Sequence, residues 1–144
     1  IRKGLFAKSA KASAVAAPSL ADDLEALLAK RAASALGLAR KAGALVTGYE
    51  KVLAEIAAGR LVLLIEARDG SEDGMRKLAG ALKSRYSALN RAEPPILKPL
   101  WGDEMDLALG RANVVHAALT QGSMKSKVLG DLARLESYGR MTRA

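Results

Sequence analysis

Apolar residues follow two patterns along this chain of 144 residues, a helical spacing of three to four residues and short continuous runs. The helical spacing predicts helices over residues 20–42, 49–58, 72–90 and 123–138, the first being one long helix or two consecutive ones, and a short helix capped by Asp103 and ended by Gly110. The continuous runs predict strands over 45–46, 61–65, 96–100 and 114–119, of which 61–65 is apolar enough to be buried on both faces. Because helices and strands alternate throughout, we expect an α/β layer fold with helices on both faces of the sheet.

Prolines and one pair of polar residues indicate where some of these segments begin or end. Pro94-Pro95 stop the preceding helix. Pro99 has no N–H to donate, so the strand 96–100 is expected to be interrupted or to lie at a sheet edge. Ser19 followed by Asp22 resembles a capping box, which would begin the first helix.

Composition limits the chemistry that the chain can perform. It contains no cysteine and a single histidine, which excludes disulfide scaffolds, thiolate zinc sites, cysteine nucleophiles and metal sites with several histidines. Lys and Arg number 23 against 15 acidic residues, giving a formal charge of +8. Such a balance indicates polyanionic partners, nucleic acid first and an anionic membrane surface second. No apolar run approaches the ~20 residues that span a bilayer, and we expect a reducing, cytoplasmic setting.

The basic excess is concentrated at the beginning of the chain. Residues 1–20 contain Arg2, Lys3, Lys8 and Lys11 and no acidic residue before position 20. They lack the apolar core of a secretory signal peptide, and the first residue is isoleucine, so we expect a processed or excerpted chain. We interpret 1–20 as a basic linker or the tail of a preceding domain and 21–144 as one domain; a tail that merely aids solubility is the alternative.

Candidate catalytic groups are few. His116 lies in a predicted strand among apolar residues, where a hydrogen-bonded core or edge histidine is the simpler interpretation. The acids Asp103, Glu104 and Asp106 are interpreted as charges at a helix N-terminus. The stretch "DGSEDG", residues 69–74, lacks the spaced carboxylates of a calcium loop. We therefore expect no enzyme activity, no catalytic residue, no metal and no cofactor.

An anion site is the stronger candidate. In "LVTGYEKV", residues 45–52, a short strand runs through Thr47 into Gly48, which opens a helix. Backbone N–H groups at a helix N-terminus bind anions, and glycine removes the Cβ that would keep a phosphate or a base edge away. The alternative is an ordinary helix start in solvent.

Two stretches resemble one known superfamily. These are "ALGLARKAGALVTGYEKVLAEIAAGRLVLLIEARDGSEDGMRKL", residues 35–78, and "LALGRANVVHAALTQG", residues 107–122. Their order and wording are similar to the ribosomal-protein-like RNA binders of the L-seven-Ae and L-thirty-e superfamily, and closest to the small bacterial YlxQ type. The resemblance covers about residues 28–138. It implies a three-layer α/β/α sandwich with a four-stranded mixed sheet that binds structured RNA, often a kink-turn.

The resemblance also implies which residues contact RNA, namely the start of the helix after the first strand and the loop before the last strand. By position these are Thr47, Gly48, Tyr49, Glu50 and Lys51, then Gly110, Arg111, Ala112 and Asn113, with Lys41 and Arg68 adding contacts. Archaeal and eukaryotic members place Asn-Glu where this chain has Glu50-Lys51, so not all side chains that read a kink-turn are present.

The beginning of the chain carries a second resemblance. "RKGLFAKSAKA", residues 2–12, and "LADDLEALL", residues 20–28, look like the tail of a YlxR-type domain, which some bacteria fuse ahead of such an RNA binder. Together these features predict a non-catalytic RNA-binding protein of the bacterial cytoplasm, associated with ribosomes or translation and binding ribosomal or kink-turn-like RNA. A protein-interaction module of the same fold is the alternative, and a small hydrolase or transferase based on His116 is the third.

Overall fold

A computed structural model of the chain describes residues 20–120 and 125–138. Helices and strands alternate along it. The elements are α1 (Leu20–Lys41), β2 (Leu45–Thr47), α2 (Tyr49–Ala58), β3 (Leu63–Glu66), α3 (Glu72–Ala88), β4 (Ile96–Leu97), α4 (Gly102–Leu109), β5 (His116–Leu119) and α5 (Lys125–Ser137). No helix in the described part of the chain is long and apolar enough to cross a membrane.

The strands form one mixed sheet in the order β2-β5-β3-β4. β5 is antiparallel to both of its neighbours, so that Thr47 of β2 lies opposite Ala117, and Glu66 of β3 lies opposite His116. β3 and β4 run parallel, with Ile65 opposite Leu97. Therefore the carboxyl ends of β2, β3 and β4 and the amino end of β5 lie at the same end of the strands. This end of the sheet is called here the site end.

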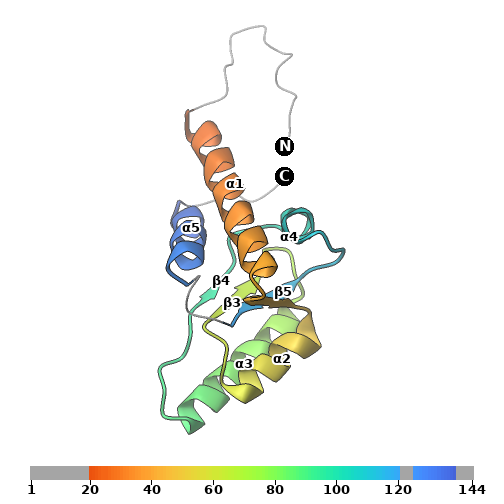
Figure 1. Cartoon of the computed structure of the whole chain (residues 1–144), viewed down its shortest axis with the longest axis vertical. Helices are drawn as coiled ribbons and strands as arrows, with labels where there is room; N and C mark the ends of the chain where they lie inside the picture. The colour runs from red at the N-terminus through yellow and green to blue at the C-terminus, as the bar shows by residue number, and fades with distance from the viewer. Residues whose placement is uncertain (1–19, 121–124, 139–144) are drawn as a thin grey trace, which may run out of the picture.

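Helices cover both faces of this sheet, with α1, α4 and α5 on one side and α2 and α3 on the other (Figure 1). Side chains alternate along the strands between two apolar clusters. Ala117 and Leu119 of β5 face the cluster with α1, α4 and α5, whereas Ala118 faces α2 and α3. This arrangement is a three-layer α/β/α sandwich, as expected.

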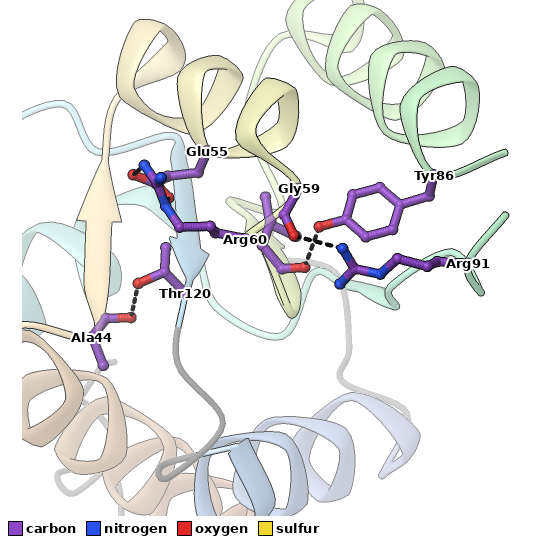
Figure 2. A network of polar contacts seen from close by, with 8 residues as sticks. Ala44, Glu55, Gly59, Arg60, Tyr86, Arg91 and Thr120 are labelled. Atoms are coloured by element: carbon purple, nitrogen blue, oxygen red, sulfur yellow. Dashed lines mark hydrogen bonds and ion pairs between the residues drawn. The ribbon is translucent and has the colours of Figure 1, made fainter. Parts of the chain in front are cut away.

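The end of the sheet opposite the site end is braced by polar contacts within the protein (Figure 2). The hydroxyl of Tyr86 on α3 donates to the carbonyl of Leu61 at 2.7 Å, and Arg91 donates to the carbonyl of Gly59 at 2.9 Å. Arg60 pairs with Glu55 at 2.9 Å, and the hydrogen bond and charge of that carboxylate raise the pKa of the guanidinium. These contacts tie the end of α2 to the end of α3.

Most predicted elements are present, with corrections at their ends. The predicted strands 61–65, 96–100 and 114–119 are shorter or shifted, at 63–66, 96–97 and 116–119, because pairing with a neighbour defines a strand. β4 is an edge strand that stops before Pro99, as expected. Asp103 does not cap α4: the N-cap is Trp101. The capping box expected from Ser19 and Asp22 lies outside the described residues.

Candidate RNA interface

Gly48 joins β2 to α2 in a backbone conformation that favours glycine. Its φ is 99° and its ψ is 149°, a region that residues with a Cβ rarely adopt. Its N–H donates to the carbonyl of His116 at 2.9 Å, and its own carbonyl accepts the N–H of Val52 at 3.0 Å. A Cβ at this position would meet no atom within 4 Å. Backbone conformation therefore requires the glycine, and the space beside it is open.

The first turn of α2 lies next to this open space. Gly48 is the N-cap and has no side chain with which to cap the helix. The N–H groups of residues 49–51 have no partner within the helix, as at any helix start. Glu50 and Lys51 are exposed, and Tyr49 is half-buried. The positive end of the helix dipole and the ammonium group of Lys51 favour an anion here.

Tyr49 rests on a buried pair of polar residues. Its ring contacts the ring of His116 edge to face, with centroids 5.8 Å apart. Nδ1 of His116 forms a hydrogen bond with Oε1 of Glu66, the residue opposite it in the sheet. Gly74 of α3 lies against the same ring, because a Cβ there would be 3.1 Å from Nε2. His116 therefore packs against Tyr49 at the start of α2. Its hydrogen bond and its burial confirm the interpretation of His116 as a hydrogen-bonded core histidine.

The loop between α4 and β5 carries the second predicted contact. Gly110 and Asn113 adopt the left-handed conformation, with φ of 64° and 59°. Residues 110–113 are all exposed, so the guanidinium of Arg111 is open to a ligand. Three residues beyond Asn113 the chain reaches His116, whose carbonyl binds Gly48. The fold therefore brings this loop and the start of α2 to the same edge of the sheet.

Asp106 fixes the shape of that loop. Its side-chain Oδ1 accepts the N–H of Val114 at 2.6 Å, and its carbonyl accepts the N–H groups of Gly110 and Arg111. The interpretation of Asp106 as a charge at a helix N-terminus is therefore wrong, although Asp103 and Glu104 do lie in the first turn of α4. Asp106 is a positioning residue that sequence patterns did not reveal, since its partner Val114 lies eight positions away, beyond the end of α4 and the loop that follows it.

Two further predicted residues lie at different distances from Gly48. Arg68 follows β3 at the site end, two residues beyond Glu66, and donates to the carbonyl of Lys98 at 3.2 Å. Lys41 is the last residue of α1, and residues 42–44 connect it to β2. The length of that strand, about 10 Å for three residues, therefore lies between Lys41 and Gly48. Lys41 instead lines a shallow surface pocket with Ala108 of α4. The structure thus groups Arg68 with the site end and sets Lys41 apart.

The site offers polar and cationic groups without a metal cage. Among the described residues, no group of three or more His, Asp or Glu side chains could hold a metal ion. The buried carboxylate of Glu66 is engaged by His116 through one oxygen. Among the residues predicted to contact RNA, Lys51, Arg68 and Arg111 are the cations at this edge, and Thr47 and Ala112 are neutral. Cationic groups on several elements favour an extended anion at this edge.

Comparisons with known proteins give a fold and no family. No protein-family model matches the chain, and no curated protein matches its sequence. A solved structure described as a protein with unknown function from Bacillus halodurans C is similar, with a TM-score of 0.62 and 22% identity over 72% of this chain and 97% of that one. This likeness shows a shared fold. Membership of the superfamily that the sequence resembles stays a prediction.

A second solved structure is more distant. The Giardia lamblia 15.5kD RNA binding protein has a TM-score of 0.46 and 18% identity over 85% of this chain and 92% of that one.

Proposed function

We propose that this chain is a non-catalytic RNA-binding protein that holds structured RNA against the site end of its sheet. The observation that carries the proposal is the start of α2, where an exposed glycine with φ of 99° opens a helix that no N-cap side chain covers. Anions bind at such helix starts, and the open space beside Gly48 leaves room for a phosphate or a base edge.

The surroundings of Gly48 support RNA over a smaller anion. Lys51 lies in the first turn of α2 and Arg111 in the loop before β5, so the cations belong to two separate elements. Structured RNA presents phosphates and exposed base edges over comparable distances, in loops, bulges and non-helical pairs. The formal charge of +8 favours the same class of partner. We propose ribosomal or kink-turn-like RNA as the ligand and the bacterial cytoplasm as the setting.

Filter binding across a salt series tests this proposal. The probes are a kink-turn RNA, ribosomal RNA fragments and a fully paired duplex of equal length. Two phosphate contacts, from Lys51 and Arg111, predict that affinity falls roughly 7- to 12-fold between 50 and 200 mM salt. Affinity that is indifferent to salt and to RNA structure would contradict the proposal.

A protein-interaction module is the second candidate, and a specific surface favours it. Two large apolar side chains are exposed on the side of the sheet that α1 and α4 cover, Leu107 of α4 at 86% and Leu38 of α1 at 50%. Leu38 and other residues of α1 line a surface pocket together with Ala108, the neighbour of Leu107 in α4. Substituting Leu107 by Asp leaves the site end unchanged. A protein partner that the unaltered chain binds and Leu107→Asp does not, together with no RNA affinity of the unaltered chain, would favour this module; RNA binding that Leu107→Asp retains would favour the site end.

A further inference from the structure

A planar pair of side chains, Arg68 and Trp101, lies beyond the residues assigned above. The guanidinium carbon of Arg68 is 5.1 Å from the centroid of the Trp101 ring, the distance of a cation–π contact. Both residues are partly exposed. Trp101 is the only tryptophan of the chain. Guanidinium and indole planes are the groups on which nucleobases stack.

The backbone holds Arg68 in place from both sides. Its N–H donates to the carbonyl of Leu100 at 2.8 Å, and Nη1 donates to the carbonyl of Lys98 at 3.2 Å. The loop after β3 is thereby tied to the segment after β4. A guanidinium that is already oriented loses less conformational entropy when a ligand stacks on it.

The backbone on either side of Trp101 is fixed as well. Its N–H donates to Oε1 of Glu104 at 2.9 Å, and the N–H of Gly102 donates to Oδ1 of Asp69 at 2.8 Å. Gly102 packs closely against this carboxylate, since a Cβ there would lie 3.2 Å from Oδ1. Hydrogen bonds therefore fix the loops that carry both planar groups.

The pair shares the site end with Gly48. β3 and β4 are parallel, so Arg68 and Trp101 both follow the carboxyl ends of their strands. Glu66, two residues before Arg68, lies opposite His116, whose carbonyl binds the N–H of Gly48. The sheet order β2-β5-β3-β4 places three strand spacings, roughly 14 Å, between the two ends of this edge. One folded RNA can therefore contact both.

We infer that Arg68 and Trp101 form a stacking platform for an unpaired base of the same RNA that contacts Gly48; this inference rests on the proposed function. The ligand is then a stem interrupted by unpaired nucleotides, with the helical part at α2 and a single-stranded base at the platform. Stacking is tolerant of base identity, so the platform selects for an unpaired nucleotide and not for a sequence.

Tryptophan fluorescence of the full chain tests the platform directly. The probes are an RNA stem with a bulge of unpaired nucleotides and the same stem fully paired. We expect the bulged stem to quench the emission of Trp101, with a midpoint equal to the dissociation constant from filter binding, and the paired stem to quench it less. Bulged RNA that binds with unchanged emission would overturn the platform and leave the proposed function intact. Absence of binding to either RNA would overturn both.

Substitutions separate stacking from simple charge. Trp101→Ala is expected to weaken binding of the bulged stem roughly 5- to 150-fold, with Trp101→Phe losing less because a ring remains. Arg68→Lys keeps the charge and removes the plane, so we expect it to weaken binding too. Arg85→Lys, on the part of α3 near Ala57, is the matched control and should bind as the unaltered chain does. Arg68→Lys with unchanged affinity would make Arg68 a phosphate contact and overturn its part in the platform. Melting curves of each variant confirm that it is folded.

Discussion

The backbone N–H of Gly48 donates to the carbonyl of His116 at 2.9 Å, and this hydrogen bond joins the start of α2 to the beginning of β5. It continues the pairing of β2 with β5 by one residue beyond Thr47. Because the loop 110–113 leads into β5, the two parts of the candidate interface share one hydrogen-bonded junction. A change at either part is therefore expected to affect the other.

Gly48→Ala is the first test of that junction. An alanine at φ of 99° is strained although its Cβ meets open space, so the free energy of unfolding should fall by about 1–3 kcal/mol. RNA affinity should fall further than the loss of folded protein explains, because the methyl group projects where the ligand approaches. Urea denaturation and filter binding on the same samples measure both quantities.

A second glycine provides the control for this test. Gly80→Ala lies in the middle of α3, where a Cβ also meets open space, and should raise stability by about 0.5–1 kcal/mol. Combining Gly80→Ala with Gly48→Ala restores part of the stability without touching the interface. If RNA affinity recovers together with stability, Gly48 serves only the backbone.

Lys51→Ala and Arg111→Ala test the two cationic parts of the edge. Each should weaken RNA binding across sequences and reduce the slope of log affinity against log salt by about 0.7–0.9, the value for one phosphate contact. Lys83→Ala is the matched control, because it removes the same charge from a surface of α3 near Asn90. A slope that changes equally in all three variants would assign the effect to net charge and not to the site.

Asp106→Ala tests whether the loop must be preformed. It removes the acceptor of the Val114 N–H, whose hydrogen bond is 2.6 Å long and part-buried, at a cost of about 1–3 kcal/mol of stability. RNA affinity should fall, because residues 110–113 lose their fixed shape. Asp106→Asn keeps an acceptor oxygen and should lose less of both. Equal RNA affinity in Asp106→Ala and the unaltered chain, measured by filter binding, would show that the loop does not need this support.

Tyr86→Phe probes the opposite end of the sheet. It removes the buried hydrogen bond to the carbonyl of Leu61 and should lower the free energy of unfolding by about 1–3 kcal/mol, because that carbonyl is left without its partner. RNA affinity of the folded protein should stay unchanged, since this contact lies away from the site end. Reduced RNA affinity under conditions where Tyr86→Phe is fully folded would mean that the two ends of the sheet are coupled.

Local sequence patterns predicted the helices well and the polar contacts poorly. Both ends of α2 agree with the prediction, because the apolar spacing and the two flanking glycines that define this helix are local signals of the sequence. Strand ends were less accurate, since they depend on partners such as Ala117 opposite Thr47, which lie far away in the chain. Glu66 and His116 are fifty positions apart, and only the register of β3 with β5 brings them together.

The same reason explains what was missed at the candidate interface. Gly48 and Arg111 stood out because a glycine at a helix start and a basic residue in a loop are local signals. The pairing of Arg68 with Trp101 depends on β3 and β4 being parallel neighbours, which no local pattern shows. Contacts between loops at one sheet edge become visible only once the strand order is known.

The shortness of β4 has a consequence for how molecules of this protein meet each other. The strand pairs over two residues, with Pro95 before it and Pro99 after it, and it forms one border of the sheet. Proline cannot donate to a strand from a neighbouring molecule, so this border is a poor template for intermolecular β-pairing. Molecules gathered along one RNA, as the proposed function requires, would therefore have little tendency to pair through this border of the sheet.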